Sequence, residues 1–127
     1  MPVSSIDFLN FAKDSISRND EIGFRNAVAR AYYCAYHHVA PIMVNAPQDS
    51  HKDLIGYLIN DSWKGNEIFQ KFDLIALGHM LNQMKGKRVI SDYKLNSVVT
   101  ESEATIAILS AEKLISKCSD MIKPKVS

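Results

Sequence analysis

Only two cysteines, Cys34 and Cys118, occur among the 127 residues of the chain, and both lie in apolar stretches. Two thiols cannot form a framework of disulfides, and no Cys or His residues show the spacing of a zinc site. We therefore expect two reduced thiols in a hydrophobic core, no metal and no cofactor.

Long apolar runs and an excess of charge are also missing. No run approaches the roughly 18 apolar residues that span a membrane. The start, MPVSSIDFLN, lacks the basic and apolar regions of a signal peptide, so we expect a cytoplasmic protein with no membrane partner. The net charge of +1 does not indicate a nucleic-acid binder, although a local basic site is compatible with it.

Apolar residues recur at helical spacing along the chain, and no hairpin turn signal is present. We predict an all-α fold, an up-and-down antiparallel bundle of four to five helices. The length fits a single domain over residues 1–127, with residues 121–127 as a flexible tail.

Capping residues place the helix starts at Ser4 or Ser5, at Asn19 or Asp20, at Ser50 with Asp53, and at Thr100 with Glu103. Pro41 should end or kink the second helix, and the third should run through Ile59. The fourth helix is predicted over residues 67–85 with Gly86 as its stop, and residues 87–99 are left as loop or helical turn. The last helix carries an apolar stripe: Ala104, Ala107, Ile108, Ala111, Ile115, Cys118 and Ile122.

A line of polar side chains runs along the second helix. Asn26, Arg30, Tyr33 and His37 fall on one face, while most of the neighbouring residues are apolar. An imidazole can exchange a proton with a ribose 2′-hydroxyl or a leaving oxygen, and a guanidinium can hold phosphate oxygens. Such cleavage of a phosphodiester needs no metal. Asn26 could orient the Arg or the phosphate, and Tyr33 could donate a hydrogen bond.

The same pattern has a structural alternative. Arg30 would pair with a carboxylate of another helix, and His37 would be a bundle histidine with satisfied hydrogen bonds. His38 lies about 100° around the helix from His37, so we prefer His37 as the reactive imidazole. Asn26, Tyr33, His38 and Arg88 are the residues we assign to support or substrate binding.

The segment RNAVARAYYCAYHH at 25–38 resembles the motif of the HEPN domain family, an Arg and a His separated by four to six residues. Six residues separate Arg30 from His37 here. RVISDY at 88–93 is similar to a segment that precedes the final helix in small stand-alone prokaryotic HEPN proteins, and the Ala-rich last helix is also similar. The resemblance spans residues from about 5 to 120.

The resemblance implies a helical homodimer whose motif helices face each other across a cleft. Many HEPN proteins are metal-independent endoribonucleases of toxin–antitoxin or defence systems, often encoded beside a nucleotidyltransferase antitoxin. Carried over, Arg30 and His37 would be the catalytic pair and RNA the substrate. The alternatives are a non-catalytic HEPN module that binds nucleotide or RNA or partners a nucleotidyltransferase, and a plain helical dimerisation protein.

The remaining polar residues carry weaker expectations. Lys85, Lys87 and Arg88 form a basic cluster that either contacts phosphate at the rim of an RNA cleft or is a solvated turn. If that stretch is helical, Arg88 and Asp92 are spaced for an ion pair. Four further expectations are a salt bridge for Arg25, an exposed His51, a buried anchor at Trp63 and a core or interface position for His79.

Overall fold

The computed structural model describes residues 2–123, and this part of the chain contains helices and no strand. The helices are α1 (Ser5–Ile16), α2 (Glu21–Val39), α3 (His51–Asn60), α4 (Lys71–Tyr93) and α5 (Glu101–Ile122), with a short 3-10 turn, η1 (Ala40–Ile42). The predicted all-α bundle is confirmed.

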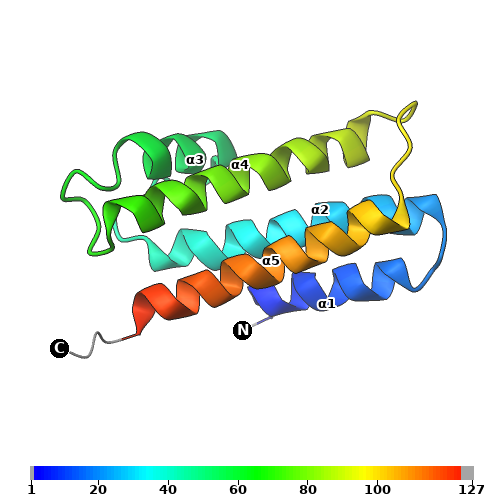
Figure 1. The fold of residues 1–127 in the computed structure, drawn as a ribbon, viewed down its shortest axis with the longest axis horizontal. Coiled ribbons are helices and arrows are strands. Elements are labelled where there is room, and N and C mark those ends of the chain that lie inside the picture. Colours follow the sequence, from blue (N-terminus) through cyan, green and yellow to red (C-terminus); the bar gives the residue numbers. More distant parts are fainter. Residues whose placement is uncertain (1, 124–127) are drawn as a thin grey trace.

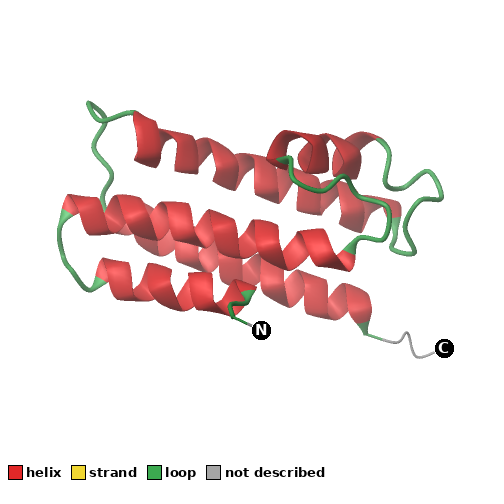
Figure 2. Ribbon diagram, turned by 180° about the vertical axis from the view of Figure 1, so that it is seen from behind, coloured by secondary structure: helices red, strands yellow, loops and turns green. Residues whose placement is uncertain are grey.

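The helix α2 forms the centre of the bundle, and it packs against α1, α4 and α5 (Figure 1). Sequential long helices run in alternating directions, and α3 packs against one end of α4. Seen from behind, α1, α2 and α4 lie in front and α5 lies behind α2 (Figure 2). One side of α2 therefore faces outward between α1 on one flank and α3 with α4 on the other.

Side-chain caps start the helices where the sequence predicts them. Asp20 accepts a hydrogen bond from the Gly23 N–H at 2.9 Å, and Ser50 and Thr100 accept corresponding bonds at 3.2 Å. Each of these caps satisfies an N–H group that has no partner within its helix. The helix α2 ends at Val39, ahead of Pro41, as expected.

The fourth helix differs from the prediction at both ends. It begins at Lys71 rather than near residue 67, and it continues through Gly86 to Tyr93. Gly86 was expected to stop the helix, but it lies in the interior, and an added Cβ there would meet no atom within 4 Å. A single glycine costs a helix only about 1 kcal/mol, so packing contacts can override it.

Arg25 explains why this helix ends where it does. The side chain is only 6% exposed, and its Nε donates to Glu21 at 2.9 Å. The guanidinium also donates to the carbonyl oxygens of four residues at the end of α4 and in the following turn: Ile90, Ser91, Lys94 and Ser97. The expected salt bridge is present, but it lies within α2. The contact between helices is instead a set of hydrogen bonds from the guanidinium to backbone carbonyls, of which those of Ile90 and Lys94 also accept from a backbone N–H.

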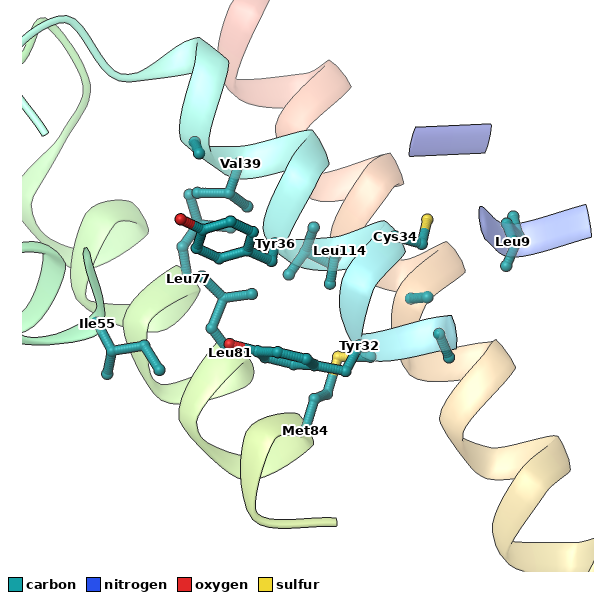
Figure 3. Packing of buried hydrophobic residues seen from close by; sticks show 14 of the residues in the cluster. Leu9, Tyr32, Cys34, Tyr36, Val39, Ile55, Leu77, Leu81, Met84 and Leu114 are labelled. Atoms are coloured by element: carbon teal, nitrogen blue, oxygen red, sulfur yellow. The ribbon is translucent and has the colours of Figure 1, made fainter. Parts of the chain in front are cut away.

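Two of the three tyrosines of α2, Tyr32 and Tyr36, pack in the core with Ile55 of α3 and with leucines of α4 and α5 (Figure 3). Cys34 and Cys118 are buried and free, and burial raises the pKa of each thiol to about 11. Both therefore remain neutral thiols in the core, as predicted. The stripe of α5 faces this core as far as Cys118, whereas Ile122 is exposed.

Three smaller expectations can be compared with the structure. Trp63 anchors its connection as expected, because it is partly buried and its indole N–H donates to the Ile59 carbonyl at 2.8 Å. His79 was expected in a core or an interface; it is exposed on α4, so the core position is wrong. Met121 and Ile122, which we placed in the tail, belong to α5, and residues 124–127 lie outside the described part. None of the described helices is long and apolar enough to cross a membrane.

Candidate functional site

The polar line predicted on α2 forms in the structure. Arg30 Nε donates to Asn26 Oδ1 at 3.1 Å, and Asn26 Nδ2 in turn donates to the Ser15 hydroxyl of α1 at 2.6 Å. Asn26 thus orients the guanidinium from one turn away, which is one of the roles the sequence suggested for it.

Arg30 is half-buried between aromatic rings. Its guanidinium carbon lies 5.3 Å from the Tyr33 ring centre and 5.9 Å from that of Phe11. At these distances the guanidinium makes cation–π interactions with both rings, and these interactions partly compensate for the water that the charge loses on burial. No carboxylate among residues 2–123 forms an ion pair with Arg30. The structural alternative of an interhelical salt bridge is therefore not what holds this side chain.

The two adjacent histidines differ in their surroundings. His37 is exposed, and its ring stacks on Phe8 of α1 with centroids 5.0 Å apart. His38 is half-buried, its Nδ1 lies 2.9 Å from the Ser5 hydroxyl, and burial lowers its pKa. His38 therefore ties α1 to α2, whereas His37 presents an imidazole at the surface next to Tyr33.

Arg88 reaches this line from α4. Its Nη1 donates to the Tyr33 hydroxyl at 2.7 Å and lies 3.8 Å from an Asp92 carboxylate oxygen, which is the ion pair expected for a helical stretch. Its Nε is buried without a hydrogen-bond partner in the described chain. The part of the guanidinium that stays exposed leaves positive charge beside the polar line of α2.

The basic cluster on α4 is divided between two faces. Arg88 lies on the side of α2, and Lys85 is close enough to His51 to lower the pKa of that imidazole. Lys87 instead lines a mostly apolar pocket between α4 and α5, beside Ile90 and Ile106. Of these three residues, Lys85 and Arg88 add positive charge to the face that carries His37, and Lys87 does not.

His51 belongs to the same face, although the sequence suggested only an exposed residue after a cap. Its ring stacks on Tyr36 with centroids 3.8 Å apart, and its Nδ1 lies 2.6 Å from the Tyr32 hydroxyl. Burial, followed by the charges of Arg88 and Lys85, lowers its pKa. No local pattern signals this contact, because the loop between α2 and α3 brings the residues together.

An open hollow lies beside His37, where the start of α1 meets the ends of α2 and α5. It is lined mainly by apolar side chains, including Phe8, Pro41, Ile42 and Ile122, and also by Ser5. Such a surface could accept a flat, uncharged group such as a nucleobase. Residues 2–123 contain no group of three or more His, Cys, Asp or Glu side chains placed to hold a metal ion.

Comparisons of the chain with models of protein families, with curated proteins and with solved structures found no match.

Proposed function

We propose that this protein is a HEPN-type, metal-independent endoribonuclease that cleaves RNA with Arg30 and His37. The observation that carries the proposal is their arrangement: an exposed imidazole and a guanidinium on one face of α2, with the Arg88 guanidinium beside them. The resemblance of residues 25–38 to the HEPN motif supports the same two residues. Because the proposed substrate is RNA, we place the action of the protein in the cytoplasm.

The residues have separate chemical roles in this proposal. His37 exchanges a proton with the 2′-hydroxyl or with the 5′ oxygen that leaves, since an exposed imidazole can do both near neutral pH. Arg30 stabilises the negative charge that develops on the phosphate oxygens. Asn26 holds Arg30 in position, and Arg88 binds a neighbouring phosphate. His38 supports the site by fixing the end of α2 against α1.

We further propose that the active form is a homodimer in a toxin–antitoxin or defence system, with a nucleotidyltransferase as a possible antitoxin. Exposed apolar side chains accompany the site, among them Phe11, which is 53% exposed beside Arg30. A second copy covering this flank of α1 and α2 would bring two motif helices across one cleft. Light scattering gives the mass of the particle, and a monomer at the concentration of the cleavage assay would rule out this arrangement.

The experiment is cleavage of RNA by the purified protein in the presence of EDTA. We expect the wild type to cut, and Arg30→Ala and His37→Ala each to lose at least about a hundredfold in rate. His79→Ala is the matched control, because His79 is an exposed imidazole of α4 outside the site. No cleavage of several structured and unstructured RNAs by the wild type would refute the nuclease.

One observation favours a second candidate, a non-catalytic module that binds nucleotide or RNA. The His37 ring lies flat against Phe8, with 23° between the planes, and Arg30 is already in contact with two aromatic rings. Stacked rings next to guanidinium groups can bind a base and a phosphate without chemistry. Binding of uncleaved oligonucleotide or nucleotide by a protein that does not cut RNA would support this alternative.

A further inference from the structure

His51 and His37 contact the same two tyrosine rings. The His51 ring stacks on Tyr36 at 3.8 Å, and the edge of Tyr36 meets His37 at 5.2 Å. Tyr33 lies 6.0 Å from His51 and 6.5 Å from His37, measured between ring centres. Two imidazoles, one from α2 and one from α3, thus flank a single aromatic pair.

The ring of His51 is held in one orientation. Tyr32 is 1% exposed, and burial raises the pKa of its phenol, so the hydroxyl keeps its proton. His51 Nδ1 is the sole hydrogen-bond partner of this hydroxyl among the described residues. This bond holds the ring from behind through Nδ1, and Nε2 is the ring nitrogen on the side away from the Tyr32 hydroxyl.

The surroundings of His51 keep the ring neutral and attract a phosphate. Burial and the nearby Arg88 and Lys85 charges disfavour a second proton on the ring. The same two cations, which lie close enough to His51 to lower its pKa, can attract the phosphates of an RNA that approaches this ring. A neutral imidazole beside a phosphate site is the usual arrangement of a general base.

We propose that His51 is a second catalytic imidazole of each subunit, acting as the general base while His37 acts as the general acid. This inference rests on the proposed function. In the reaction, His51 takes the proton of the ribose 2′-hydroxyl, and the 2′ oxygen bonds to phosphorus. The bond from phosphorus to the 5′ oxygen breaks, and His37 gives its proton to that oxygen. The products are a 2′,3′-cyclic phosphate and a free 5′-hydroxyl end.

In this proposal Nε2 of His51 takes the proton, because Nδ1 is hydrogen-bonded to the buried Tyr32 hydroxyl. A hydroxyl both donates and accepts, so the Tyr32 phenol can accept the hydrogen bond of an Nδ1 proton when Nε2 is the basic atom. Tyr32 is accordingly a positioning residue whose loss should lower kcat more than it changes KM.

The test uses a short RNA with one scissile linkage and a second version whose 5′ oxygen at that linkage is sulfur. A thiolate leaves without protonation, so the sulfur substrate needs a base and no acid. On normal RNA, we expect His51→Gln and His37→Ala each to lower kcat by about a hundredfold to ten-thousandfold. On the sulfur substrate, His37→Ala should recover most of its rate, and His51→Gln should not.

Each of the other possible results would contradict a specific part of the two proposals. If wild-type protein and His37→Ala behave as proposed but His51→Gln keeps the full rate, His51 has no catalytic role and the nuclease proposal stands. Rescue of His51→Gln by sulfur contradicts its role as the base. Absence of wild-type cleavage refutes both proposals. Urea unfolding checks that His51→Gln is folded, and Tyr32→Phe, which keeps the packing and removes one hydroxyl, should by itself lower kcat about tenfold.

Discussion

The Arg88 guanidinium donates a hydrogen bond to the Tyr33 hydroxyl across 2.7 Å, and it thereby joins α4 to the polar line of α2. The two residues are 55 positions apart in the sequence. Arg88 is mostly buried, with 17% of its side chain exposed, and its Nε has no acceptor in the described chain. Burying a donor without a partner costs free energy, whereas the exposed part of the guanidinium can still attract an anionic RNA backbone.

Removing Arg88 should weaken RNA binding in a charge-dependent way. We expect Arg88→Ala to lower the affinity for 2′-O-methyl RNA, which cannot be cleaved, and to reduce the slope of log affinity against log salt by about 1. Tyr33→Phe should leave this slope unchanged, because the charge remains. Fluorescence anisotropy at several salt concentrations measures both. Lys87→Ala, which alters the pocket between α4 and α5, is the control, and an equal loss there would contradict a role specific to Arg88.

The sequence predicted most of the fold, because α2, α3 and α5 begin at residues whose side chains cap them and the apolar residues recur at helical spacing. The end of α4 could not be predicted in this way. Gly86 is a local signal for a helix stop, and the contacts of Arg25 that hold the helix beyond it come from a residue far away in the chain. Tertiary hydrogen bonds thus outweighed a local preference of about 1 kcal/mol.

In the candidate site, too, contacts within one helix could be predicted from the sequence and contacts between helices could not. The spacing of Arg30 and His37 within one helix put them on one face, and the structure agrees with this local prediction. The neighbours from other helices, Arg88 and His51, could not be predicted in this way, because their positions depend on how the chain connects and packs the helices. His51 was missed altogether as a neighbour of the tyrosines, since nothing around residue 51 signals a contact with Tyr32 or Tyr36.

Two histidines should make the fold sensitive to mild acid. Burial lowers the pKa of His38 below 6.5, and burial with the charges of Arg88 and Lys85 lowers that of His51. The unfolded chain therefore binds more protons than the folded one near this pH. The free energy of unfolding should decrease as the pH falls through about 6.5 and should level off below the folded pKa values.

Urea denaturation at about pH 7.5 and pH 5.5 measures this decrease. His38→Gln and His51→Gln should each reduce the difference between the two pH values, because each removes one group with a shifted pKa. If the wild-type protein were equally stable at both pH values, neither imidazole would be linked to folding in the way the structure indicates.

Two glycines of α4 should respond to alanine in opposite directions. An added Cβ at Gly78 would lie 2.6 Å from Ile59 Cγ1 and 3.1 Å from Leu58 Cβ, so Gly78→Ala should destabilise the protein by about 1–3 kcal/mol. Gly86 has open space around it within the helix, so Gly86→Ala should stabilise by roughly 0.5–1 kcal/mol. Thermal and urea unfolding provide the measurement. A loss of stability in Gly86→Ala would mean that α4 does not continue through this residue.

The guanidinium of Arg25 should be the most costly charged group to remove from the fold. Its loss removes a donor from four backbone carbonyls at the end of α4 and in the following turn, those of Ile90, Ser91, Lys94 and Ser97. Ile90 and Lys94 keep a backbone N–H donor. We expect Arg25→Ala to lower the free energy of unfolding by about 2–4 kcal/mol. Arg25→Lys should rescue little of this loss, because an ammonium lacks the planar fork that spans several acceptors.

A matched charge removal separates this cap from a general electrostatic effect. Lys13 pairs with Glu112 at 3.2 Å, but both side chains are more than 40% exposed, so Lys13→Ala should cost less than about 1 kcal/mol. Hydrogen exchange localises the effect of Arg25→Ala, which should remove protection first from the amides at the end of α4. Equal stabilities of the two variants, or unchanged exchange there, would show that the cap does not hold α4 beyond Gly86.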